Sequence, residues 1–178
     1  CNVIEAHRGG RRVSIALDIV RTYRAPREVL RRRIGSHERE DRALAILMGA
    51  CFLIFVAQWP RLSREAFIDD TVAIDGLMAG ALFGWVIIAP LFFYTLALLV
   101  HWGLVAFRRA STGYMSRVAL FWALLAAAPM WLLSGLLTGF IGETPATSMV
   151  GVLALGSFLV FWGSGVVEIA KRPVAAQE

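Results

Sequence analysis

The sequence has few of the residues from which catalytic and metal sites are usually built. Its 178 residues include 3 histidines and 2 cysteines. Cys1 stands at the start and Cys51 lies inside an apolar run, so neither a structural disulfide nor a paired-cysteine zinc site is expected. The chain also lacks an H-E-x-x-H motif, a phosphate-binding glycine loop and a G-x-S-x-G elbow. We therefore expect a protein that is not an enzyme, without catalytic residues, bound metal or cofactor.

Charge is missing from long stretches of the chain, and these stretches dominate its composition. Apolar residues make up 58% of the sequence and the mean hydropathy is +0.65. Soluble domains contain roughly 45–50% apolar residues, and a domain of this size could not bury so much more apolar surface. The predicted fold class is an all-α membrane protein: a four-helix transmembrane bundle with an N-terminal amphipathic surface helix.

Four apolar stretches are candidates to cross a hydrocarbon core of about 30 Å. They are residues 43–59, 77–107, 118–142 and 148–167. Trp59 and Pro60 are expected to close the first stretch with an interfacial aromatic ring and a helix stop. The second stretch would measure about 46 Å as one straight helix. It must therefore tilt, kink or project beyond the bilayer, and Pro90 is the expected site of a kink.

Basic residues alternate between the segments that join these stretches. Eleven of the eighteen lie before residue 43, three in the second connection and two after the last stretch. The first connection has only Arg61 and Arg64, and the third has none, so the two sets of segments hold sixteen against two. Because basic segments stay on the cytoplasmic side, we predict that both termini are cytoplasmic.

Residues 13–42 are predicted to form a basic, amphipathic arm. Apolar residues recur at helical spacing from Ile15 to Tyr23, and Pro26 is placed to begin a second short helix. One interpretation puts an apolar stripe at the acyl boundary and arginines at the lipid phosphates; the other packs a soluble helix against the chain's own cytoplasmic loops. Next to so hydrophobic a remainder, the basic block indicates membrane lipids and not nucleic acid as the partner. The candidate headgroup-binding residues are Arg24, Arg27, Arg31, Arg32 and Arg33.

The two ends of the chain lie outside the predicted bundle, which covers residues 43–172. Residues 1–12 are polar and aperiodic, and the first residue is Cys rather than Met. We expect residues 1–12 to be a disordered or non-native extension, with Val13 as an alternative start. No signal peptide is expected, because about 42 residues precede the first apolar run. Residues 173–178 are expected to be a tail.

Glycines four residues apart mark two candidate helix-packing faces, since small residues on one face let another backbone approach closely. The predicted packing or dimer residues are Gly76, Gly80 and Gly84 in the second stretch and Gly135 and Gly139 in the third. Packing within one bundle is the favoured interpretation, and a homodimer or a docking face for another membrane protein is the alternative.

Ionisable residues are few in the apolar stretches, where they usually mark function. Glu168 follows the last stretch and precedes Lys171 by three residues, which favours an interfacial ion pair. A proton-coupled carboxylate is the alternative, and with kinks at Pro90 and Pro129 it leads to a second function, a small transporter or transporter subunit.

Two longer segments are similar to a known family. Residues 40–66 read EDRALAILMGACFLIFVAQWPRLSREA, and residues 108–133 form a basic link with a tyrosine and a small-residue run, RRASTGYMSRVALFWALLAAAPMWLL. With the charged arm and the long second stretch, they resemble the bacterial branch of the Yip family of Ypt/Rab-interacting-type membrane proteins.

The resemblance covers most of residues 13–171 and implies a non-enzymatic, polytopic protein of the bacterial inner membrane. Members of the family often have five spans, whereas four are predicted here. Eukaryotic relatives act in vesicle trafficking and contact small GTPases, but that partner does not carry over to a bacterium. The expected role is scaffolding or membrane organisation through partner proteins and anionic lipids, and the family has no catalytic motif to transfer.

Overall fold

A computed structural model describes residues 15–34, 40–69, 73–106 and 112–171, and within these residues every regular element is a helix. Four helical segments are long and apolar enough to cross a membrane. The predicted all-α class with a four-helix transmembrane bundle is therefore confirmed.

The four long segments contain the predicted apolar stretches, apart from single residues at two ends. Residue 107 lies outside the described part, and Gly142 follows the third helix by one residue. The second segment is divided by a short π-helical turn, η1. The bounds are α3 Glu40–Ile68, α4 Ile74–Phe83, η1 Gly84–Ile88, α5 Ala89–Ala106, α6 Gly113–Ile141 and α7 Pro145–Ala170.

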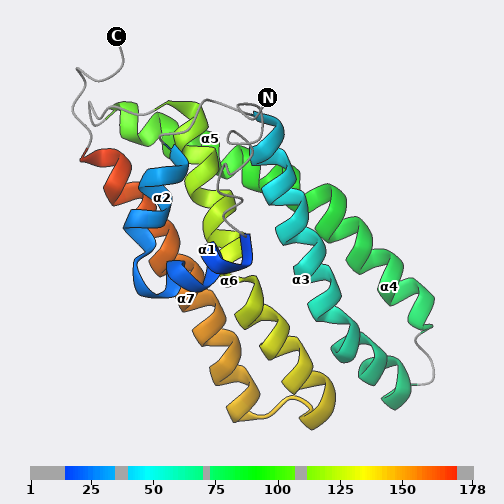
Figure 1. Ribbon diagram of the computed structural model, residues 1–178. Helices are drawn as coiled ribbons and strands as arrows, with labels where there is room; N and C mark the ends of the chain where they lie inside the picture. The colour runs from blue at the N-terminus through cyan, green and yellow to red at the C-terminus, as the bar shows by residue number, and fades with distance from the viewer. Residues whose placement is uncertain (1–14, 35–39, 70–72, 107–111, 172–178) are drawn as a thin grey trace, which may run out of the picture.

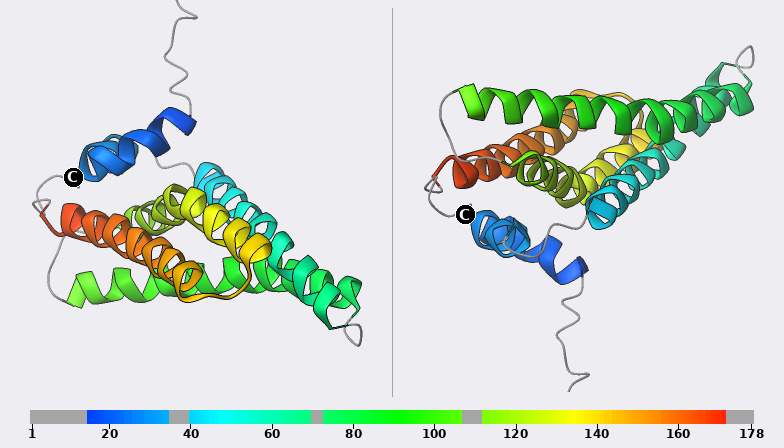
Figure 2. Two further views of the ribbon diagram at one scale, coloured as in Figure 1. Left: turned by 90° about the horizontal axis from the view of Figure 1, so that it is seen from below. Right: turned by 90° about the horizontal axis from the view of Figure 1, so that it is seen from above.

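The helices form three layers (Figures 1 and 2). Helices α3, α6 and α7 make the middle layer, the α4–α5 segment covers one side of it, and two short helices, α1 (Ile15–Arg24) and α2 (Pro26–Ile34), cover the other. In an apolar stretch of 18 residues taken from each long segment, half of the α6 residues are buried, against 6% of those in the α4–α5 segment. Helix α6 is therefore the core of the bundle, and most of α4–α5 faces outward.

Pro60 does not end the first long helix, so the predicted helix stop is wrong. Helix α3 continues through Pro60 to Ile68, and the added turns include Leu62, which is 8% exposed. A proline inside a helix leaves one carbonyl without its N–H donor, but membrane helices tolerate this where a neighbouring helix packs against the site. Helix α6 supplies that neighbour, because Gly139 lies directly against the Pro60 ring.

The predicted kink site at Pro90 coincides with a change of hydrogen bonding. The π-helical turn Gly84–Ile88 ends two residues before Pro90, and α5 then continues to Ala106. Pro90 has no N–H to donate to the preceding turn, and in membrane helices a local π-type adjustment can re-satisfy the backbone groups that a proline frees. The second span is thus one helical segment with a local irregularity rather than two spans.

Candidate functional site

The predicted arm is fixed to the bundle by hydrogen bonds from its first helix. The indole N–H of Trp122 in α6 donates to the hydroxyl of Thr22 at 3.1 Å, and that hydroxyl donates to the carbonyl of Asp18 at 2.7 Å. The phenol of Tyr23 donates to the carbonyl of Ala126 at 3.1 Å. Both bonds to α6 join residues about a hundred positions apart, so they fix α1 in space against the bundle.

The second helix of the arm packs through its apolar side chains. Val29 is 7% and Leu30 is 2% exposed, and Leu30 fills the space beside Gly165 in α7 where a larger residue would place its Cβ. The ring of Tyr23 stands edge-on to Phe161 of α7, with 5.0 Å between the ring centres. In the described residues, the arm therefore lies against the membrane spans α6 and α7 rather than against connecting loops.

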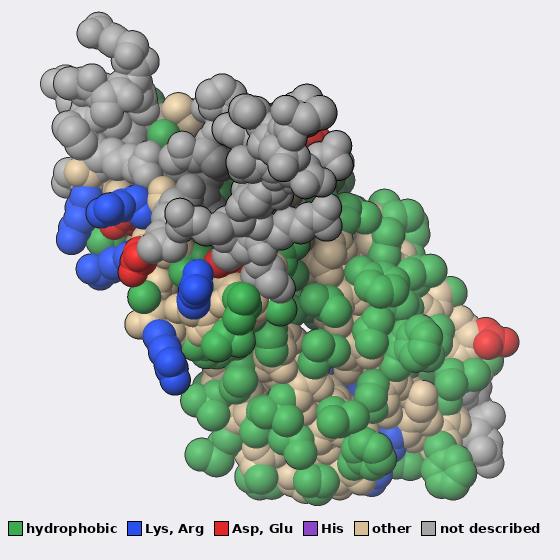
Figure 3. Space-filling model, viewed as in Figure 1, with side chains coloured by type: hydrophobic (Ala, Val, Ile, Leu, Met, Phe, Trp, Pro, Cys, Tyr) green, Lys and Arg blue, Asp and Glu red, His purple; other side chains and the backbone are tan. Residues whose placement is uncertain are grey.

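The arm presents its arginines outward. Arg24, Arg27 and Arg31 are exposed, whereas the side chains of Arg32 and Arg33 lie outside the described part of the structure. Basic side chains gather over α1 and α2 in the space-filling view, beside a hydrophobic surface over the rest of the bundle (Figure 3). Helix α1 also exposes apolar residues on this face, among them Val20 at 61%. Arginines and apolar residues side by side suit the boundary between headgroups and acyl chains.

The two sets of predicted packing glycines differ in how closely a neighbouring helix approaches them. A Cβ at Gly135 would overlap the carbonyl of Ala57 in α3, and one at Gly139 would overlap Pro60, so these glycines let α3 and α6 approach closely. A Cβ at the glycines of the α4–η1 segment would meet no described atom within 4 Å. That open set is Gly76, Gly80 and Gly84.

A polar cleft opens at the opposite end of the bundle from the arm. It is defined by Gln58, Arg61, Arg64 and Glu65 on α3, Ser134 and Thr138 on α6, Glu143 in the connection, and Ser148 on α7. The α3 residues recur at three- and four-residue spacing and therefore share one face of the helix. This face exists only because α3 continues beyond Pro60.

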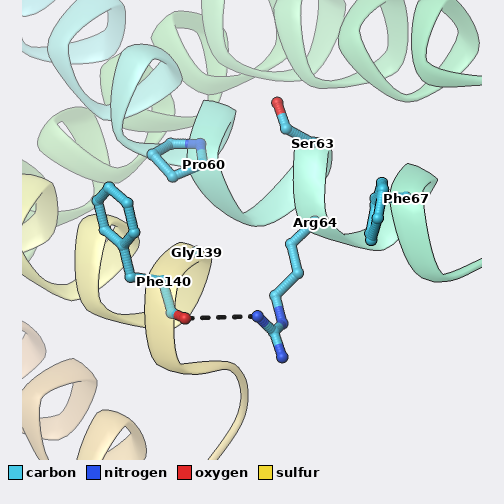
Figure 4. Close-up of a pocket in the computed structure, with 6 residues that line it drawn as sticks. All are labelled: Pro60, Ser63, Arg64, Phe67, Gly139 and Phe140. Atoms are coloured by element: carbon cyan, nitrogen blue, oxygen red, sulfur yellow. Dashed lines mark hydrogen bonds between the residues drawn. The ribbon is translucent and has the colours of Figure 1, made fainter.

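The cleft consists of three adjoining hollows of about 430, 390 and 270 Å³. The largest is lined by Pro60, Phe67 and Phe140 around Arg64, and Figure 4 shows Arg64 between the two phenylalanines. The smallest extends between α3, α6 and α7 as far as Gly151. Because Gly151 is six residues after Pro145, the first residue of α7, the cleft reaches about 9 Å along this helix.

The two arginines of the cleft make only long contacts with described residues. Arg61 Nε lies 3.9 Å from Glu143 Oε1, and the two side chains are 49% and 81% exposed. The guanidinium of Arg64 donates to the carbonyl of Phe140 at 3.4 Å (Figure 4). A guanidinium has five N–H donors, so these long contacts leave most of the donors of both arginines for a ligand or for water.

A buried donor also lies in the wall of the smallest hollow. Among the described residues, the indole N–H groups of Trp131 and Trp162 are the buried side-chain polar groups without a hydrogen-bond partner, and Trp131 lines this hollow. Sequence reasoning used Arg61 and Arg64 only to count charges and missed the cleft. The available signal was polar residues at helical spacing, with Ser134 and Thr138 beside the glycines of α6.

Charged residues near the end of the bundle that carries the arm can also be placed. Arg117 of α6 bonds Glu40 at the start of α3 at 2.6 Å, which ties the two central helices together. Glu168 and Lys171 both lie in the described part, but they form no ion pair with each other there, so the predicted pair is wrong. Lys171 follows the last helical residue, Ala170, and its side chain is exposed.

Comparison of the chain with protein-family models, curated proteins and solved structures found no match. The functional assignment therefore rests on two features of the molecule itself, the docked basic arm at one end and the polar cleft at the other.

Proposed function

We propose that this chain is a non-enzymatic inner-membrane protein of the Yip type that organises anionic lipids through its basic arm. The observation that carries the proposal is the buried hydrogen bond from Trp122 to Thr22, which holds the arm on the bundle. A fixed arm presents Arg24, Arg27 and Arg31 as a rigid set of charges. Clusters of arginine on an amphipathic helix attract anionic headgroups.

The length of α6 is compatible with an arm at the membrane interface. Its 29 residues measure about 44 Å, roughly 14 Å more than the hydrocarbon core. Trp122 lies nine residues after Gly113, about 14 Å along the helix axis. If the additional length projects at the Gly113 end, where Arg117 pairs with Glu40, α1 lies at the edge of the core. We propose that this end faces the cytoplasm, as the distribution of basic residues predicts.

The outward face of α4–α5 is the proposed contact surface for other membrane proteins or for a second copy. It carries the open glycines Gly76, Gly80 and Gly84, against which no described helix packs. Lipid alone would also cover this face, and crosslinking in the native membrane distinguishes the two.

Lipid selectivity tests the proposed role of the arm. The full chain would be reconstituted in nanodiscs that contain phosphatidylcholine with a minor fraction of phosphatidylglycerol, and the lipids retained around the protein would be quantified by native mass spectrometry. Each arginine near an anionic surface contributes about 1 kcal/mol. Replacing Arg24, Arg27 and Arg31 by Gln should therefore reduce phosphatidylglycerol enrichment by at least about tenfold.

The matched control replaces the same three arginines by Lys, which keeps the charge. The Lys variant should retain the enrichment, and added salt should weaken it in both the parent and the Lys variant. Equal enrichment by the parent and the Gln variant would exclude the arm as the lipid-binding element.

The polar cleft favours a second function, a small transporter or transporter subunit. Polar side chains that line a hollow within membrane spans often mark a substrate pathway. Glu168, whose alternative interpretation is a proton-coupled carboxylate, lies near the other end of α7, about 35 Å along the helix from its first residue, Pro145. Proton flux into proteoliposomes that disappears in the Glu168→Gln variant would support transport; the absence of flux in the parent would exclude proton coupling.

A further inference from the structure

We propose that the polar cleft binds the headgroup of phosphatidylethanolamine from the leaflet at the Glu143 end. This site is independent of the arm, which lies at the opposite end of the bundle. It differs in chemistry too, because the arm offers only positive charge whereas the cleft combines both signs with an apolar wall.

The arginines of the cleft supply the phosphate-binding part. Arg61 and Arg64 both line the hollow of about 390 Å³, which we call the middle hollow. Each arginine makes one long contact with another residue in the described part of the chain. Two guanidinium groups three residues apart on one helix face match an anion with several oxygen atoms, and phosphate is one of the groups that arginine binds through two hydrogen bonds at once. Their remaining donors face the hollow without having to break a short ion pair.

The apolar wall identifies the ligand as an amphiphile. Beside Arg64, the largest hollow is lined by Pro60, Phe67 and Phe140, and the two phenylalanines are 86% and 77% exposed. A phosphate bound at Arg64 would carry its acyl chain directly over these rings (Figure 4). A phosphate-containing metabolite without a chain would leave this surface uncovered, which favours a lipid as the source of the headgroup.

The carboxylates of the middle hollow provide a site for the second charge of the headgroup, its ammonium. Glu65, Asp69 and Glu143 line it together with the arginines. Carboxylates near a bound phosphate would repel a purely anionic lipid, but they accept hydrogen bonds from a primary ammonium. The quaternary ammonium of phosphatidylcholine has no N–H to donate. The cleft should therefore prefer phosphatidylethanolamine to phosphatidylcholine and to phosphatidylglycerol.

Binding of short-chain lipids to the purified full chain tests this assignment. The chain in mild detergent would be titrated with dihexanoyl phosphatidylethanolamine, dihexanoyl phosphatidylcholine, dihexanoyl phosphatidylglycerol and soluble glycerophosphoethanolamine, with binding followed by native mass spectrometry. We expect phosphatidylethanolamine to bind at least about tenfold more tightly than each of the other three probes, the difference that one lost charge-assisted contact produces. This comparison needs no variant and is not affected by misfolding.

Two variants assign the preference to the cleft. Arg61→Gln with Arg64→Gln should weaken phosphatidylethanolamine binding by at least about tenfold. Glu65→Gln with Asp69→Asn and Glu143→Gln should remove the preference over phosphatidylcholine while phosphate binding remains. The arm variant with Arg24, Arg27 and Arg31 changed to Gln should bind phosphatidylethanolamine like the parent.

Equal affinity for phosphatidylethanolamine and phosphatidylcholine would overturn the proposal, as would unchanged binding by the variant with Arg61 and Arg64 changed to Gln. Glycerophosphoethanolamine binding as tight as the lipid would overturn the lipid source and identify a soluble ligand.

Discussion

The indole N–H of Trp122 donates to the hydroxyl of Thr22, and each of these side chains is only 1% exposed. The bond joins residues 100 positions apart, from an N-terminal arm to the central helix of the bundle. A buried donor that loses its partner costs about 1–3 kcal/mol, so this bond stabilises the docked arm against an undocked one. The arginines of the arm owe their fixed position to it.

Thr22→Val should undock the arm. Valine has the shape of threonine but no hydroxyl, so the buried N–H of Trp122 would lose the Thr22 acceptor, at a cost of about 1–3 kcal/mol. Hydrogen exchange in the peptide that covers residues 15–34 should become about 5- to 150-fold faster. Thr22→Ser keeps the hydroxyl and should exchange at nearly the parent rate. Equal protection in the Val and Ser variants would mean that the hydrogen bond does not hold the arm.

Ionisation of Tyr23 should oppose docking at high pH. Desolvation by burial raises the pKa of Tyr23 above its ordinary value of 10.0. A group whose folded pKa is raised contributes stability that is complete below its unfolded pKa and is lost as pH rises through the folded pKa. Docking should therefore be unaffected by Tyr23 up to about pH 10 and weaken above it.

Phenolate absorbance measures this titration directly. The difference between the titration of the parent and that of the Tyr23→Phe variant isolates the contribution of one phenol. Its midpoint should lie above pH 10.0, the ordinary value for tyrosine. In the Thr22→Val background, where the arm is undocked, the midpoint obtained from the same difference should shift back towards the ordinary value for tyrosine. A midpoint at or below the ordinary value in the parent would show that the phenol does not pack against Phe161 and donate to Ala126.

The spans could be predicted from the sequence, but the contacts between them could not. Hydropathy and bilayer thickness act on local segments, so the four apolar stretches are visible without knowledge of their neighbours. The helix stop predicted at Pro60 is wrong because the local rule ignores Gly139, whose missing side chain makes room for the proline ring. The partners Thr22 and Trp122 carry no mark in the sequence, since threonine and tryptophan are ordinary in such segments.

The cleft could not be predicted from the sequence either, because it depends on where α3 ends. Arg61 and Arg64 looked like loop residues as long as the helix was expected to stop at Pro60. Once α3 continues, its helical period brings both arginines to face Thr138 and Glu143 from other elements. A wrong helix end therefore concealed a complete candidate site.

The ion pair of Arg117 with Glu40 should contribute little to stability. The two side chains are 30% and 53% exposed, and pairs of this kind contribute about 0.2–1 kcal/mol. Glu40→Gln should thus lower the free energy of unfolding in nanodiscs by no more than about 1 kcal/mol. Glu40→Arg should destabilise more, through repulsion from Arg117, and adding Arg117→Glu should recover most of that loss. A double variant as unstable as the single one would show that the two charges do not interact.

The two sets of glycines should respond oppositely to an added methyl group. At Gly135 the new Cβ would overlap the carbonyl of Ala57, so Gly135→Ala must push α3 away from α6 and should destabilise the bundle by about 1–3 kcal/mol. At Gly80 the same change meets no described atom and should stabilise the monomer by up to about 1 kcal/mol, because alanine is the better helix former. Thermal unfolding and crosslinking of both variants in native membranes separate the roles of the two sets. If Gly80→Ala instead destabilises the chain and abolishes a crosslinked dimer, the open face of α4 is an interface between two copies. If crosslinking does not change, lipid covers that face, and the α3–α6 contact is the one that depends on glycine.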